Sequence, residues 1–95
     1  MKIFAHDYKI THCDLTDEGN FGECVPEHLE ILLEKTLPAS IRLEVGAHEL
    51  IEAFNFHLEL RLKHNQITSL GYALAQFLKD NGLSGAFDAL LKGKK

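Results

Sequence analysis

The spacing of apolar residues changes near Pro38 and predicts two differently built parts of the chain. From Ala39 onward, apolar residues recur three and four positions apart, which is the period of a helix with one face on a core. The helical period starts at Ala39, and Ser40 is a suitable N-cap for the first helix. Its apolar arc consists of Leu43, Ala47, Leu50, Ile51, Phe54 and Leu58.

Two further helices are predicted after the first. One begins near His64 or Asn65 and ends at Lys79–Gly82, where Gly82 suits the left-handed position that closes a helix. A short third helix is expected from Leu83 to Lys92. The apolar face of the second helix consists of Ile67, Leu70, Leu74, Phe77 and Leu78.

The first third of the chain favours strands and loops. Residues 2–10 predict a strand, and the polar residues 14–20 predict a loop. A hairpin-like element follows, in which residues 21–25 form a short strand and Pro26-Glu27 turns the chain. For residues 28–35 helix and strand compete, and we favour strand because the apolar run is short and ends close to Pro38.

Together these patterns predict a single α+β domain over residues 1–95. Residues 1–37 would be mainly strands and loops, and residues 38–95 mainly helical. We expect a short antiparallel sheet of two or three strands, packed on a helical hairpin plus a short C-terminal helix. Ninety-five residues, of which 45% are hydrophobic, suffice for one modest core.

Charge and cysteine content narrow the class of partner. The formal charge is −4 and no stripe of Lys and Arg is present, so nucleic acid is not an expected partner. The only basic cluster, residues 92–95, is assigned no function. Cys13 and Cys24 do not make a disulfide framework and are expected to be free thiols. No apolar run approaches the length of a membrane span and residues 1–7 lack a signal-peptide core, so we expect a cytoplasmic protein without a membrane partner.

Candidate chemistry lies on the first predicted helix, in the sequence His48-Glu49-Leu50-Ile51-Glu52. This is the zinc-protease signature His-Glu-x-x-His with the second histidine replaced by Glu52. Residues four apart share one helix face, so His48 and Glu52 could hold a divalent metal between them. Glu49 points about 100° away around the helix, where zinc proteases place their general base. The polar stripe formed by His48, Glu52, Asn55 and Glu59 could instead be only a solvated helix face.

Five pieces of the chain resemble small zincin-like proteins encoded by bacteriophages and prophages. They are residues 22–24, 48–53, 60–62, 64–67 and 76–81, and together they span most of the sequence. The resemblance implies that a residue early in the second helix completes the metal site, and here that neighbourhood holds His64. It therefore implies metal ligands His48, Glu52 and His64, with Glu49 as base. The chain departs from the pattern at Glu52, and at residues 44–47, where Gly46 weakens the helix beside the motif.

The third ligand depends on where the first helix ends. A helix rises 1.5 Å per residue, so one unbroken helix would separate His48 from His64 by about 24 Å. The helix must therefore end early, and residues 55–57 are where we expect it to fray. If the helix continued to Leu62, His57 or solvent would have to replace His64.

Two functions from different classes follow. In the first, a zinc ion (Zn²⁺) held by His48, Glu52 and His64 serves a minimal metallopeptidase, with Glu49 as base and a peptide substrate added along the sheet edge. In the second, the chain is a non-catalytic phage accessory protein that keeps the fold and works by homo-oligomerisation or by binding a host protein. A phage-encoded protein would act in the host cytoplasm.

The other His, Cys and aromatic residues give weaker indications of a functional site. His6, His12, Cys13, Cys24 and His28 lack paired metal-ligand spacing and are interpreted as isolated structural residues. The aromatic residues are interpreted as core and edge side chains, because no basic residues interleave with them.

Overall fold

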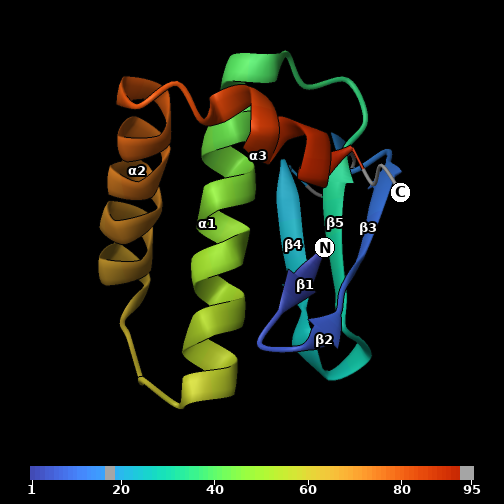
Figure 1. Cartoon of the computed structure of the whole chain (residues 1–95). Coiled ribbons are helices and arrows are strands. Elements are labelled where there is room, and N and C mark those ends of the chain that lie inside the picture. The colour runs from blue at the N-terminus through green and yellow to red at the C-terminus, as the bar shows by residue number, and fades with distance from the viewer. Residues whose placement is uncertain (17–18, 93–95) are drawn as a thin grey trace.

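A computed structural model of the chain describes residues 1–16 and 19–92 (Figure 1). Two earlier expectations extend outside these residues, namely part of the 14–20 loop and the last three residues of the basic cluster 92–95. The elements in chain order are β1 (Lys2–Ile3), β2 (His6–Asp7), β3 (Lys9–Cys13), β4 (Gly22–Val25), a 3-10 turn (Pro26–His28), β5 (Glu30–Glu34), α1 (Ala39–Leu58), α2 (His64–Asp80) and α3 (Ser84–Leu91).

The α+β class is confirmed, with a main sheet of three strands in the order β3-β5-β4. Residues 28–35 do contain a strand, β5, which pairs antiparallel with β4 as expected. β3 differs from the expectation, because it pairs parallel with β5 and the sheet is therefore mixed. β5 takes the centre because its Ile31 and Leu33 are fully buried, and this leaves β4 as an edge strand.

Residues 2–10 are not one strand. Phe4 and Ala5 both adopt left-handed backbone angles, with φ of 52° and 69°, and they reverse the chain between β1 and β2. Apolar and polar alternation alone gave no sign of this turn, because neither residue is a glycine or asparagine. The strand signal belongs to β3, which starts only at Lys9.

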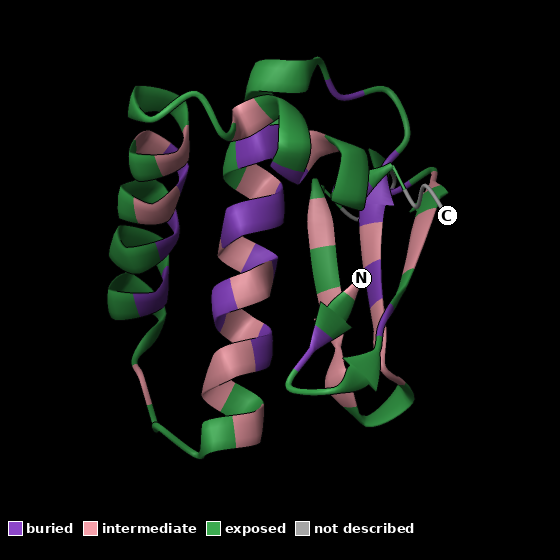
Figure 2. Ribbon diagram, viewed as in Figure 1, coloured by how far each residue is buried: buried purple, intermediate pink, exposed green. Residues whose placement is uncertain are grey.

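The core lies where α1 packs against the sheet. Figure 1 shows α1 between α2 and the strands, with α3 crossing one end of the molecule. In Figure 2 the buried positions run along α1 and the middle of the sheet, whereas the outer side of α2 is exposed. The buried cluster includes Ile31, Leu33, Leu43, Ala47, Phe87 and Leu91.

The helix ends decide the course of the chain past the candidate site. α1 ends at Leu58, one residue after the predicted fraying segment, and Glu59 closes it in a left-handed conformation with φ 52°. α2 begins at His64, and Gly82 follows it with φ 69°, as predicted. The predicted N-cap Ser40 is wrong, because Pro38 occupies that position and its carbonyl accepts a hydrogen bond from the Arg42 N–H at 2.8 Å. Among the described residues, no helix has the length and apolar character needed to cross a membrane.

Candidate metal centre

His48 and Glu52 lie one turn apart on α1, on the side that faces α2. The Nε2 atom of His48 is 3.6 Å from the Oε2 atom of Glu52, and the two side chains are 25% and 34% exposed. Partial burial matters, because such a site is still open to an ion or substrate while bulk water is partly excluded. The helical spacing predicted from sequence is therefore the spacing found.

His64 reaches this pair because the chain reverses sharply after α1. Glu59 and Arg61 both adopt left-handed backbone angles, with φ of 52° and 59°. Asn55 fixes the reversal: its carbonyl accepts a hydrogen bond from the Leu60 N–H at 3.1 Å, and its side-chain Oδ1 accepts one from the Leu62 N–H at 2.9 Å. The early end of α1 that the third ligand required is thus present.

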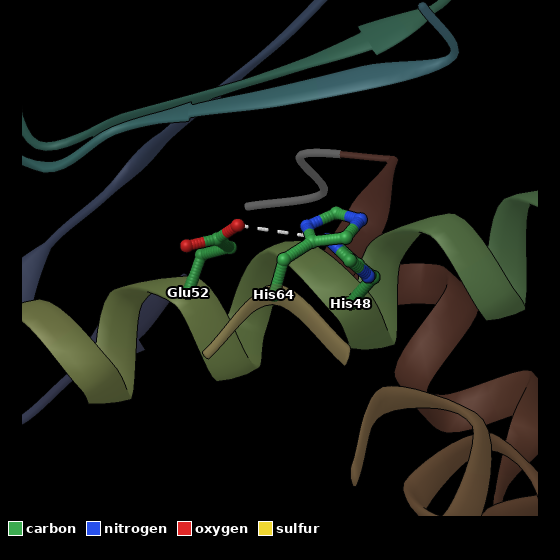
Figure 3. Close-up of side chains that lie close together, drawn as sticks. All are labelled: His48, Glu52 and His64. Carbon is green, nitrogen blue, oxygen red and sulfur yellow. Dashed lines mark ion pairs between the residues drawn. The ribbon is translucent and has the colours of Figure 1, made fainter. Parts of the chain in front are cut away.

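The three predicted ligands converge. Figure 3 shows His64 from the start of α2 lying beside His48 and Glu52 from α1. One ligand atom from each residue lies within 4.8 Å of the other two, and the rings of His48 and His64 have centroids 5.8 Å apart. Within the parts of the chain that the structure describes, this is the one such group of His, Cys, Asp and Glu side chains.

The donor set matches zinc in kind. Two imidazoles and one carboxylate are the protein ligands of thermolysin-type zinc sites, which leave a fourth position open. Ligands about 2.0–2.2 Å from a tetrahedral zinc lie roughly 3.3 Å from one another. The 3.6 Å between His48 Nε2 and Glu52 Oε2 is near this value, whereas the three ligand atoms lie within 4.8 Å of one another, so the group as a whole would have to contract around an ion.

Gly71 explains how α2 comes so close to His48. A Cβ atom placed on Gly71 would lie 2.8 Å from the His48 Cα atom and 3.1 Å from its backbone nitrogen. Any larger residue at position 71 would therefore push α2 away from α1. Because His64 is seven residues earlier on the same face of α2, this contact sets the distance between His64 and His48.

Glu49 lies on the other side of the motif, between α1 and the start of β4. Its side chain is buried, with 7% of the residue exposed. A Cβ atom on Gly22 would lie 3.2 Å from its Oε2 atom, so a glycine at that point of β4 makes room for the carboxylate. Burial is the main cause that raises the pKa of Glu49 to about 7, and the negative charges of Glu52 and Glu23 add to it.

A cavity of about 290 Å³ has both His48, one of the three candidate ligands, and Glu49 in its lining. It lies between α1, α2 and the residues that begin β4. The remaining lining residues are Phe21, Gly22, Glu44, Val45, Thr68 and Tyr72. Glu49 therefore shares one solvent-connected space with a candidate metal ligand, as a general base acting on water would need.

The other metal-binding residue types have separate places in the fold. The His12 ring is 2.8 Å from the Leu91 carbonyl oxygen, through Nε2, and the His6 ring stacks on His57 at a centroid distance of 4.7 Å. Cys13 and Cys24 are free and half-buried, and burial is the main cause that raises the pKa of Cys24 to about 12. His57, the alternative third ligand, has its Nε2 atom 2.6 Å from the Tyr8 hydroxyl.

Sequence reasoning did not identify two residues that shape the site. The sequence pattern assigns Asn55 only to the polar stripe and to the segment where the helix is expected to fray, although an asparagine near a helix end is a recognisable turn signal. Gly71 had no signal, because its role depends on contact with another helix. Gly46, expected to weaken the helix beside the motif, faces Leu91 of α3, where a Cβ atom would lie 2.5 Å from Cδ1.

No protein-family profile, curated protein or solved structure matches the chain. The case for a function therefore rests on the geometry of His48, Glu49, Glu52 and His64 and of the cavity beside them.

Proposed function

We propose that the protein is a small zincin-like metallopeptidase of phage or prophage type, with His48, Glu52 and His64 as zinc ligands and Glu49 as general base. The observation that supports this most is the convergence of ligand atoms from two helices within 4.8 Å, beside a buried carboxylate. If the polar stripe on α1 were only a solvated helix face, there would be no reason for His64 to lie beside it after a tight reversal of the chain.

In this proposal, the metal site, Glu49 and β4 have different roles in peptide hydrolysis. Bound zinc supplies a Lewis acid, which polarises a peptide carbonyl and lowers the pKa of water. Glu49 accepts the proton of the water that attacks the carbonyl carbon. It then gives that proton to the leaving amine as the C–N bond breaks, which restores the carboxylate. The substrate lies extended along the edge strand β4, whose first residues line the cavity.

The test is the Glu49→Gln variant, in which an amide of similar shape cannot accept the proton. We expect zinc content to stay the same and zinc-dependent cleavage to fall by about 10²-fold or more, the usual contribution of a general base. Cleavage is measured by mass spectrometry on a pool of unstructured peptides. Glu59→Gln, a matched change on an exposed residue directly after α1, should leave cleavage intact. Cleavage that survives Glu49→Gln unchanged would contradict the assignment.

A non-catalytic interaction protein is the second candidate, and the surface of α2 favours it. Leu70 and Phe77, seven residues apart on one face of this helix, are 46% and 58% exposed. Large apolar side chains gathered on one element are more typical of a contact surface than of a solvated one. Under this alternative the zinc site is vestigial, and no peptide in the pool would be cleaved by the zinc-loaded protein.

A further inference from the structure

The cavity beside the metal ligands has a lining that selects for one kind of side chain. It opens one helical turn before His48, because Glu44, Val45 and His48 from α1 form one wall. Phe21 and Gly22 at the start of β4 form the second wall, and α2 forms the third. An extended peptide on the edge of β4 would therefore direct a side chain into this space.

The walls combine aromatic faces with negative charge. Phe21 and Tyr72 are 58% and 59% exposed, so their rings are free for contact. Val45 adds an aliphatic surface to the lining, and Glu44 is an exposed carboxylate. Among the described residues, no Lys or Arg lines the cavity. This pairing suits a long basic side chain, whose methylene stem lies on apolar surface while its charged end meets aromatic rings or a carboxylate.

We infer that the cavity binds an arginine or lysine side chain of the peptide substrate, with Glu44 as the charge that selects it. The inference rests on the proposed function for the position of the peptide, and adds the substrate class. An apolar side chain of equal length would make the same contacts with Val45. It would lack the charge attraction to Glu44 and the cation–π contact with the aromatic rings. A glutamate side chain would be repelled by Glu44 and Glu49.

Glu44 is separate from the catalytic machinery. It lies four residues before His48 on the same face of α1, and it is exposed rather than buried. Its removal should therefore change which peptide binds without changing how zinc is held. This makes Glu44→Gln a specific probe of the cavity.

The experiment compares three blocked tetrapeptides that differ only in one central residue: arginine, norleucine or glutamate. Binding is followed by NMR on zinc-loaded Glu49→Gln protein, which holds the metal without turnover. We expect the arginine peptide to bind about ten-fold tighter than the norleucine peptide, a difference that a cation–π contact and one exposed ion pair can supply. The shifted signals should belong to Val45, Thr68 and Tyr72.

Adding Glu44→Gln should reduce the preference for arginine to about two- to three-fold, since only the ring contacts remain. Adding Glu59→Gln instead, which removes the same charge elsewhere, should leave the preference unchanged. Equal affinity for arginine and norleucine, or a preference that Glu44→Gln does not alter, would overturn the inference. If the protein holds no zinc, the same titration of the metal-free chain still tests the cavity, so failure of the proposed function and failure of this inference give different results.

Discussion

At the scale of single residues, Asn55 shows how much of the site depends on a side chain that binds nothing itself. Its amide oxygen and backbone carbonyl hold the first residues after α1, and His64 follows within a few positions. At position 55, a residue without a side-chain acceptor would leave the Leu62 N–H to hydrogen-bond with water. The turn after α1 would then be held less firmly. The proposed ligands His48 and His64 come from two different helices, and this turn brings them together.

Arg42 and Asp88 form the best-defined ion pair of the described residues, and they join α1 to α3. The Arg42 Nε and Nη2 atoms donate hydrogen bonds to the two Asp88 oxygens at 2.6 and 2.9 Å, and the side chains are only 15% and 16% exposed. Hydrogen bonding to Arg42 is the main cause that lowers the pKa of Asp88 below its usual value of 3.8.

Because the pKa of Asp88 is lower in the folded state, the pair adds stability above about pH 4, and this is lost as the pH falls through the folded-state pKa. We expect Arg42→Met to reduce the free energy of unfolding at pH 7 by about 3 kcal/mol, as for one partner of a buried pair. The difference from wild type should narrow below pH 4. Urea unfolding at pH 7, 5 and 3 measures it.

Lys2→Ala is the matched control, because Lys2 and Asp7 pair at 2.9 Å but are 69% and 79% exposed. Its stability should equal that of the wild type at all three pH values. A stability loss in Arg42→Met that is as large at pH 3 as at pH 7 would show that packing of the arginine stem, rather than its charge, holds α3.

At the scale of elements, two glycines allow helices to approach α1 from different sides. Gly71 of α2 meets the His48 backbone, and Gly46 of α1 meets Leu91 of α3. Positions 46 and 48 point about 200° apart around α1, so the two contacts affect different surfaces. The proposed metal ligands His48 and His64 lie near the first contact, between α1 and α2, and not near the second.

We therefore expect Gly71→Ala to weaken zinc binding by about ten-fold or more, because the added methyl group separates His64 from His48, and overpacking of this kind costs about 1–3 kcal/mol. Gly46→Ala should destabilise the fold by a comparable amount while zinc affinity stays within about two-fold of wild type. Competition with a chelating dye measures affinity, and thermal unfolding of the metal-free proteins measures stability. Equal zinc affinity in both variants would refute the role of Gly71.

At the scale of the whole molecule, sequence patterns predicted those elements of the fold that depend on interactions between residues close in the chain. The three helices, the strands β4 and β5 and the stop at Gly82 follow from periodicity and turn residues. The parallel pairing of β3 and the reversal at Phe4 and Ala5 could not be predicted from these local patterns. Both depend on which surfaces the strands bury. The convergence of His48, Glu52 and His64 was predicted, because the motif places the first two on one helix face and the family resemblance implies the third. Burial of Glu49, the Gly71 contact and the cavity arise only when helices and sheet meet.

The central claim is that His48, Glu52 and His64 bind zinc. Elemental analysis of the purified, untagged protein, before and after chelator dialysis and zinc addition, tests it most directly. The account predicts about one zinc per chain, and none after His48→Ala. Zinc at about 100 times its dissociation constant should raise the melting temperature by roughly 10 °C or more. A chain that holds no zinc, or one whose zinc content and melting temperature do not respond to His48→Ala, would contradict it.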